Sequence, residues 1–358
     1  MADKEKAAGL SAVKEALQKP AAPKFTLDTT VGPEFSALME KDLAPLHGED
    51  RKKVSLMTGI SGSQKALAAS SLLRHYGQAV IIVPEQKDIF RWEEDLAFFA
   101  PEADVLPCPR VEDSGFQVTF SGTERLRDRM QSLGKLMGHR PVVIVATSVE
   151  AAQKIEGPLQ LSDRTFTLSL GDEIDRDELL EKLVSLGYER VDQVERCGHF
   201  AVRGDIVDIY PISEEHPLRV EFFGDEVDSI RSFDEDSQRS IETRKQALIL
   251  PISAGGARDA SLMDFLDKGI IVYDEPQRAE ESLKRYFKEE KENRNRAFSW
   301  EDLVRKGRKQ GNKEVLFTLL NRSLTGFSSP AVLAWQGQSM TNYQRQIPIF
   351  IEDLKSLL

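Results

Sequence analysis

Three short apolar runs constrain the fold of this chain more than any other feature of its sequence. The runs are residues 79–83 (AVIIV), 142–146 (VVIVA) and 270–273 (IIVY), and none of them has a polar face. Such runs are typical of strands that are buried on both sides of a parallel sheet. Helical patterns, for example at residues 89–99, separate the runs, and this alternation predicts a doubly wound α/β layer.

Antiparallel patterns replace helical ones between the second and third runs. Residues 187–211 (GYERVDQVERCGHFAVRGDIVDIYP) mostly alternate strand-favouring apolar residues with polar ones. Two further strands are expected at 218–223 and 226–230, joined by a Gly-Asp turn. We therefore predict a small α+β domain with an antiparallel sheet, inserted at about residues 151–235 into a larger α/β domain.

The composition of the chain argues against several classes of function. The chain has 358 residues, enough for two or three domains, and its net charge of −11 argues against a protein whose main task is to grip nucleic acid. Its two cysteines, Cys108 and Cys197, form neither a disulfide framework nor a metal-ligand spacing. No apolar run approaches the length of a membrane span, and the charged N-terminus lacks the apolar core of a signal peptide. We therefore expect a cytoplasmic protein that contacts no membrane.

A degenerate phosphate-binding loop lies between a predicted strand and a predicted helix. A working loop reads G-x-x-x-x-G-K-[ST], in which the lysine neutralises phosphates and the hydroxyl holds magnesium. Gly59, Gly62 and Lys65 are present, but Gln64 replaces the last glycine and Ala66 replaces the hydroxyl residue. Because alanine supplies no magnesium ligand, we interpret the loop as a relic. Residual phosphate binding through Lys65 and the helix N-terminus is the alternative.

An acidic pair, Asp274 and Glu275, ends the third apolar run. It resembles a Walker B segment, in which an apolar strand delivers carboxylates to magnesium. Any strand can end in such a pair, but together with the degenerate loop it indicates a helicase-like, P-loop NTPase-type parallel-sheet domain. Because no hydroxyl-bound magnesium is expected, we assign no catalytic residue and predict no metal site.

Two sequence blocks carry a resemblance to a known family. GYERVDQVERCGHFAVRGDIVDIYP and RVEFFGDEVDSIRSFDEDSQRS resemble the signature shared by UvrB and the N-terminal part of the bacterial transcription-repair coupling factor, Mfd. TGISGSQKA, GTERLRDRM before PVVIVATSVEA, and YDEP support the resemblance. VDQV after GYER is more similar to the coupling factor. UvrB would also carry an intact phosphate loop and an aromatic-rich hairpin near residues 85–115.

The resemblance implies the domain order 1A, 2 and 1B of a UvrB-homology module. The expected segments are an N-terminal helix at 1–24, domain 1A at 25–150, the UvrA-binding domain 2 at 151–235, domain 1B at 236–345 and the start of a truncated region at 346–358. The last segment ends in an apolar helical pattern without a glycine or proline stop, so the chain looks cut from something longer.

The resemblance also implies a function in transcription-coupled nucleotide excision repair. The chain is expected to act as a catalytically silent adaptor that recruits UvrA. The parent protein is expected to be an ATP-dependent DNA translocase that displaces stalled RNA polymerase. ATP, magnesium, the polymerase and double-stranded DNA are therefore assigned to downstream domains, and no cofactor is expected in this chain. A later domain of the parent is expected to cover the UvrA-binding face.

Five residues match positions that face UvrA in UvrB-type domains: Arg190, Arg203, Arg219, Glu221 and Phe200. Arginine pairs well with carboxylates and is common among interface anchors. Arg219 and Glu221 are two residues apart on one predicted strand, so they share a face. Phe200 is expected to supply an apolar anchor between the charges. For each arginine, the alternative is a surface ion pair that contributes little.

Two other functions stay open from the sequence. A weak ATPase or helicase fragment would use Lys65, Asp274 and Glu275 for residual nucleotide binding, although Gln64 and Ala66 argue against it. A DNA-binding module would show a steep salt dependence of its affinity, although the net charge argues against it.

Overall fold

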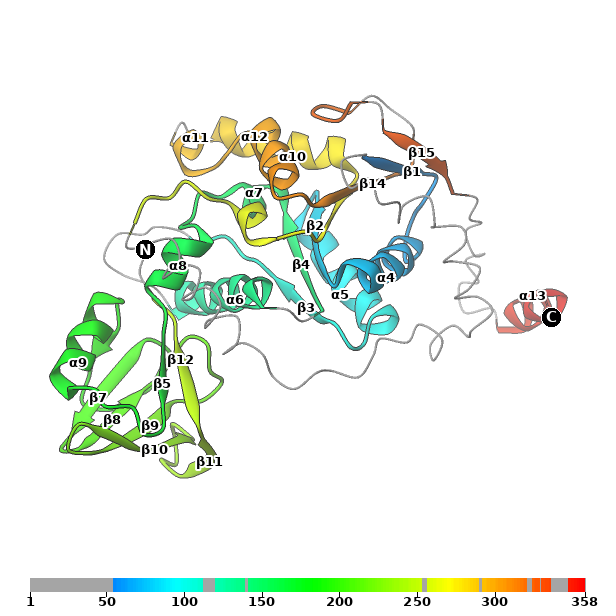
Figure 1. Cartoon of the computed structure of the whole chain (residues 1–358). Coiled ribbons are helices and arrows are strands. Elements are labelled where there is room, and N and C mark those ends of the chain that lie inside the picture. Colours follow the sequence, from blue (N-terminus) through cyan, green and yellow to red (C-terminus); the bar gives the residue numbers. More distant parts are fainter. Residues whose placement is uncertain are drawn as a thin grey trace.

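The computed structural model describes residues 54–111, 120–138, 141–252, 256–289, 292–320, 324–328, 330–335 and 347–357. The helix expected at residues 1–24 lies outside these ranges. Figure 1 shows a large α/β unit and a smaller antiparallel unit at the lower left. The predicted fold class, a helicase-like α/β domain with an inserted antiparallel-sheet domain, is confirmed.

A seven-stranded parallel sheet forms the centre of the large unit, in the order β15-β1-β14-β13-β2-β4-β3. Its strands are β1 (Ser55–Thr58), β2 (Gln78–Val83), β3 (Asp104–Pro107), β4 (Val142–Thr147), β13 (Ile270–Asp274), β14 (Lys313–Thr318) and β15 (Ala331–Ala334). The three apolar runs form the adjacent strands β13, β2 and β4. Nearly all of their side chains are buried, because helices cover both faces of the sheet.

The two faces of this sheet have separate apolar cores. Ile81 of β2 packs on the side of α4 (Gln64–Tyr76) and α5 (Gln86–Phe99), whereas Ile82 joins the core on the other side. The helices on or beside that second core are α6 (Phe120–Met137), α7 (Ser148–Ala152), α8 (Pro158–Asp163), η2 (Leu262–Phe265), α10 (Pro276–Glu289), α11 (Asn293–Arg296) and α12 (Trp300–Lys309). This period-two switch between cores explains why the strands are apolar throughout.

Local sequence sets the ends of several helices. Thr147 caps α7, because its hydroxyl accepts from the Glu150 N–H while the Glu150 carboxylate accepts from the Thr147 N–H. Ser299 caps α12 by accepting from the backbone N–H of Asp302. Gly77 ends α4 at a φ of 72°, a conformation that costs glycine little.

The chain leaves the large sheet after β4 and returns at β13. β5 (Phe166–Ser169) and β12 (Gln246–Ile249) pair antiparallel and carry the chain out and back. Between them lies a six-stranded sheet in the order β11-β10-β9-β8-β7-β6. Its strands are β6 (Glu189–Arg190), β7 (His199–Arg203), β8 (Ile206–Ile209), β9 (Leu218–Phe223), β10 (Glu226–Phe233) and β11 (Ser240–Arg244). The predicted hairpin is confirmed as β9 and β10.

The six-stranded sheet continues past residue 235, where the inserted domain is expected to end. β11 pairs with β10, and its side chains are largely exposed. A short exposed edge strand lacks apolar alternation, so its pattern does not predict a strand. The domain bounds stay a prediction, as does the region at 346–358, where α13 (Ile347–Leu357) lies.

The small unit has its core on one face of its sheet. Phe200, Val207 and Val220 lie on this inner face and pack with residues of α9 (Arg176–Ser185) and of the β5–β12 pair. Asp175 caps α9 by accepting from two backbone N–H groups. Because side chains alternate along each strand, the opposite face receives the polar residues.

Candidate partner-binding face and phosphate-loop position

Two rows of side chains lie on the face of the small sheet opposite α9, the first across β7 to β10 and the second across β8 to β10. Residues of neighbouring strands lie side by side in each row because they are register partners. The first row is Arg203, Ile206, Glu221 and Ser229, the second is Asp208, Arg219 and Arg231, and Phe223 lies two residues beyond Glu221. We call these residues the outer face.

Arg219 is held in place by its neighbours. Its Nε and Nη2 donate to the two carboxylate oxygens of Asp208 at 2.7 and 2.8 Å, and Nη2 also donates to Gln238 at 3.1 Å. The guanidinium lies over the Phe233 ring, 4.5 Å from its centroid. Hydrogen bonding to Asp208 raises the pKa of Arg219. Arg219 therefore shapes the outer face, and its contact with UvrA stays a prediction.

Glu221 is paired in the same way. Its carboxylate accepts from the Ser229 hydroxyl at 2.8 Å and forms an ion pair with Arg231. The expectation that Arg219 and Glu221 share a face is confirmed by the alternation along β9. Both charges have partners within the sheet, so the outer face is nearly neutral at its centre.

Arg190 and Arg203 are the exposed arginines of the predicted set. Nη2 of Arg203 donates to the backbone oxygen of Asp192 at 3.2 Å, which ties β7 to the loop after β6. Arg190 lies on the edge strand β6 as the register partner of Phe200. Register partners share a face, so Arg190 is placed opposite to Arg203 at the sheet edge. The structure therefore does not gather all predicted residues on one face.

Phe200, the expected apolar anchor, is not at the surface. Its side chain is 0% exposed and packs in the core of the small unit. Phe200 and Arg203 are three residues apart on β7, and an odd separation puts two strand residues on opposite faces. The prediction that Phe200 contacts a partner is wrong for this physical reason.

Sequence reasoning also missed two residues of the outer face. Phe223 ends β9 with its side chain 80% exposed, and it follows Arg219 and Glu221 at intervals of two. Arg231 lies one residue beyond the strand expected at 226–230 and is the register partner of Arg219 in β10. The period-two pattern was a sufficient signal for Phe223, but the register shift between Val227 and Ser229 hid the position of Arg231.

The phosphate-loop position lies between β1 and α4 in the large unit. Gly59 and Gly62 have φ values of 77° and 54°. A Cβ at Gly59 would lie 2.8 Å from the backbone oxygen of Trp335, so the chain after β15 closes over this glycine. The Gly62 oxygen accepts from the Lys65 N–H at 3.1 Å. The glycines thus serve a tight connection between strand and helix.

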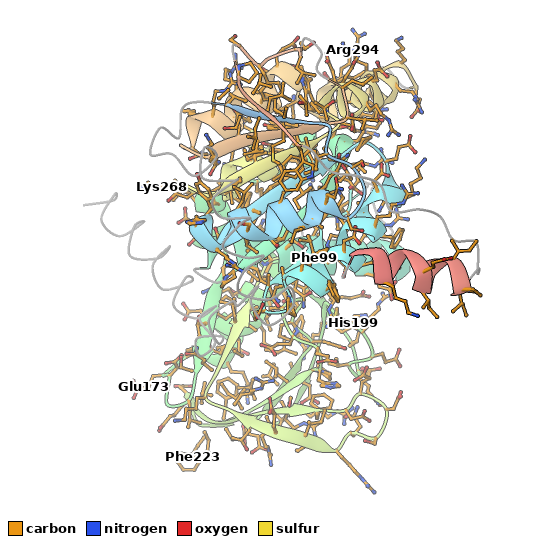
Figure 2. All side chains as sticks on the ribbon, turned by 90° about the vertical axis from the view of Figure 1, so that its right-hand side faces the viewer. Phe99, Glu173, His199, Phe223, Lys268 and Arg294 are labelled. Atoms are coloured by element: carbon orange, nitrogen blue, oxygen red, sulfur yellow. The ribbon has the colours of Figure 1, made fainter. Side chains whose placement is uncertain are left out.

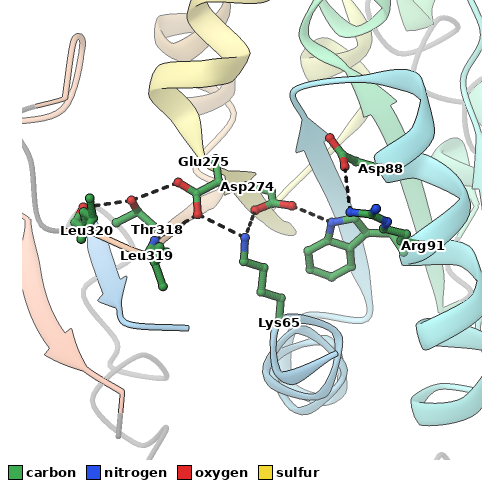
Figure 3. A network of polar contacts seen from close by, with 9 residues as sticks. Lys65, Asp88, Arg91, Asp274, Glu275, Thr318, Leu319 and Leu320 are labelled. Atoms are coloured by element: carbon green, nitrogen blue, oxygen red, sulfur yellow. Dashed lines mark hydrogen bonds and ion pairs between the residues drawn. The ribbon is translucent and has the colours of Figure 1, made fainter. Parts of the chain in front are cut away.

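The side chain of Lys65 points at the acidic pair that ends β13 (Figure 3). Its Nζ lies 2.5 Å from Oδ1 of Asp274 and 3.3 Å from Oε1 of Glu275. In a working loop this ammonium group neutralises phosphates. Here the ammonium group pairs with carboxylates of the same chain, so Lys65, Asp274 and Glu275 form one ion cluster.

Asp274 has a hydrogen-bond partner on each oxygen. Oδ2 accepts from the indole N–H of Trp92 at 2.9 Å, and the Trp92 ring stacks on Phe317 with centroids 6.4 Å apart. Burial raises the pKa of Asp274, while the neighbouring Lys65 and Trp92 oppose this shift. Sequence reasoning missed Trp92, because only the packing of α5 against the sheet brings it to β13.

Glu275 is fastened to the end of β14. Its Oε1 accepts from the backbone N–H of Leu319 at 3.0 Å, and Oε2 accepts from the Thr318 hydroxyl at 3.3 Å. Its φ is 45°, which is uncommon for a residue with a side chain. These contacts hold Glu275 in a sparsely populated conformation.

Ala66, which stands where a magnesium-binding hydroxyl would be, is 1% exposed and packs in an apolar core. The loop offers magnesium no side-chain oxygen at this position. Within the described ranges, no group of three or more His, Cys, Asp or Glu residues could hold a metal ion. None of the helices described is both long and apolar enough to cross a membrane.

The small unit has a known counterpart. A family model described as the UvrB interaction domain matches residues 166–254, which run from the start of β5 to just after β12. The expected recognition of a UvrB-like module is confirmed. The inserted sheet and its outer face thus lie within the matched segment.

Three further proteins are similar to more than half of this chain. The chain is 30% identical over 230 residues to the transcription-repair-coupling factor of Bacillus subtilis (strain 168), covering 62% of this chain and 19% of that protein. It is 28% identical over 207 residues to the factor of Escherichia coli (strain K12), covering 58% and 18%. It is 29% identical over 214 residues to UvrABC system protein B of Thermosipho africanus (strain TCF52B), covering 56% and 32%.

These similarities support an N-terminal UvrB-like module of the transcription-repair-coupling factor type. The matched part spans about a fifth of the coupling factors and about a third of the UvrB protein. The names and the matched domain relate the chain to nucleotide excision repair.

Proposed function

We propose that this chain is the UvrA-recruiting adaptor of transcription-coupled nucleotide excision repair. The observation that carries the proposal is the match of residues 166–254 to the UvrB interaction domain. That segment forms a separate six-stranded sheet, and its outer face is rich in arginine and carboxylate groups. UvrA is the partner, and the small unit makes the contact.

Arg190 and Arg203 supply the charge for this contact. Both are exposed, and no carboxylate within the described ranges forms an ion pair with either guanidinium. The whole chain carries a net charge of −11, so two unneutralised arginines are a local feature. Guanidinium groups suit bidentate pairing with carboxylates on a partner.

On the outer face, the pairs Arg219–Asp208 and Glu221–Arg231 form the surface between Arg203 and the hairpin tip. Their side chains are already held by hydrogen bonds, so binding orders few of them further. A face that is ordered beforehand loses less conformational entropy when a partner arrives.

We further propose that the phosphate-loop position performs no catalysis and needs no ATP or magnesium in this chain. The ion cluster of Lys65, Asp274 and Glu275 supports this reading, because a nucleotide would have to break it. ATP-driven translocation on double-stranded DNA and displacement of RNA polymerase are assigned to other domains of a longer cytoplasmic protein. The UvrA-binding face is covered there by a later domain.

A charge-reversal variant tests the adaptor proposal. The double substitution Arg190→Glu with Arg203→Glu should abolish UvrA binding measured by calorimetry while the thermal unfolding transition stays unchanged. Its matched control is Arg285→Glu with Arg294→Glu, which reverses two exposed arginines of the large unit and should bind normally. Full affinity of the first variant for UvrA would overturn the assignment of Arg190 and Arg203 to the contact.

A further inference from the structure

We infer that Phe223 is the apolar anchor of the partner contact and that it enters an apolar pocket on UvrA. The inference rests on the proposed function and names the residue at which the apolar part of that contact is made. It assigns to Phe223 the part that the sequence had suggested for the buried Phe200.

Phe223 has the most exposed large apolar side chain among the residues described, at 80%. It is the last residue of β9 and pairs with Glu226 across the turn at Gly224, whose φ is 66°. Figure 2 shows Phe223 at the end of the molecule remote from the large unit, projecting away from the sheet. The hairpin tip therefore presents the ring to solvent.

The core of the small unit does not need this ring. Phe222, the preceding residue, lies on the inner face with 6% exposure and packs with Val220 in the core. Two consecutive residues of a strand face opposite sides, so Phe222 completes the core and Phe223 cannot join it. Removing the Phe223 ring should therefore cost folding little.

Single exposed apolar residues are common, and Phe223 is distinguished from them by its position. Phe223 lies on the outer face beside the row of Arg203, Ile206 and Glu221. Ile206 is partly buried in that row and adds apolar surface next to the charges. An exposed aromatic ring beside arginines and carboxylates has the composition of an interface hot spot, in which a ring fills a pocket and polar groups surround it.

The anchor and the arginines should respond differently to salt. Exposed charges are screened by ions, so the loss caused by reversing Arg190 and Arg203 should shrink as salt rises. Burial of an apolar ring does not depend on such screening. The loss caused by Phe223→Ala should therefore persist at high salt, which separates its contribution from that of the charges.

The experiment measures UvrA affinity and thermal stability of Phe223→Ala with Phe90→Ala as the matched control. Phe90 lies in the large unit, and its side chain is 61% exposed. Phe223→Ala should keep the unfolding temperature and bind UvrA at least about tenfold more weakly at both low and high salt. Phe90→Ala should bind like the unmodified chain.

A second variant gives a direct reading of burial. In Phe223→Trp, the difference spectrum against the unmodified chain should show tryptophan emission moving to shorter wavelength when UvrA is added. Unchanged affinity of Phe223→Ala, while the unmodified chain binds UvrA, would overturn the anchor and leave the proposed function standing. If the unmodified, folded chain does not bind UvrA, the proposed function fails and the anchor with it.

Discussion

Nζ of Lys65 lies 2.5 Å from Oδ1 of Asp274 and joins the first turn of α4 to the end of β13. The two side chains are 14% and 9% exposed, so the ion pair is largely shielded from water. A nucleotide at this position would have to take the ammonium group away from a buried carboxylate. The ion pair thus has a structural role, because it joins α4 to β13 at the position where a working loop would bind phosphate.

Replacing Lys65 should destabilise the large unit. Lys65→Met leaves Asp274 and Glu275 without their cation, and loss of one partner of a buried pair costs about 3 kcal/mol of unfolding free energy. Urea denaturation measures this loss. The double variant Lys65→Met with Asp274→Asn should recover part of it, because the unpaired buried charge is removed. Equal stability of Lys65→Met and the unmodified chain would refute a structural role of the pair.

Nucleotide should leave the stability of the chain unchanged. A ligand that binds the folded state raises its melting temperature with ligand concentration. Because Lys65 is occupied and Ala66 offers no hydroxyl, millimolar ATP with magnesium should give no rise in thermal unfolding scans. A rise that grows with ATP concentration and disappears in Lys65→Met would show a nucleotide site instead.

Arg219 and Arg203 should differ in their effect on folding. Arg219→Ala leaves the carboxylate of Asp208, which is 4% exposed, without its bidentate partner, and should cost about 2–3 kcal/mol. Arg203→Ala removes an exposed side chain and should change stability by less than about 0.5 kcal/mol. Denaturant titration of both variants distinguishes them, and equal losses would contradict the assignment. Binding data on Arg219 variants therefore need a stability control.

Acidification should weaken the small unit through His199. Its Nε2 accepts from Nε of Arg196 at 2.8 Å, and burial together with the Arg196 charge lowers its pKa, which Glu189 and Glu195 oppose. A lowered pKa in the folded state means that the unfolded chain binds the proton more readily. The stabilisation is therefore present above the ordinary pKa near 6.5 and is lost as pH falls below it.

The unfolding free energy should accordingly decrease between about pH 7 and pH 5.5. His199→Gln keeps a polar side chain without this titration and should show a flatter pH profile. If both proteins lose stability with the same slope, His199 is not the responsible group.

The spacing of apolar residues and the turn sequences were enough to predict much of the fold. The runs that became β2, β4 and β13 are apolar on both faces, and the Gly224–Asp225 turn marks the hairpin of β9 and β10. The same reasoning did not predict β14, because this strand begins with two charged residues, Lys313 and Glu314. Both are buried, with 2% exposure. Glu314 is tolerated there because it pairs with Arg308 at 2.6 Å, a contact that only the folded chain creates.

The two candidate sites were likewise only partly predictable from the sequence. The motif remnants identified Lys65, Asp274 and Glu275. They did not indicate that the three side chains bind one another, nor that Trp92 and Thr318 join them from distant segments. On the small sheet, alternation placed Arg219 and Glu221 together. The same rule, applied from Arg203 to Phe200, would have placed that ring inside and directed attention to Phe223.

The adaptor function has one most direct test, which is calorimetric titration of the unmodified chain with UvrA at two salt concentrations. We predict saturable binding at one site, with an affinity that decreases as salt rises because Arg190 and Arg203 contribute charge. A folded chain that gives no binding heat and no complex with UvrA at either salt concentration would contradict it.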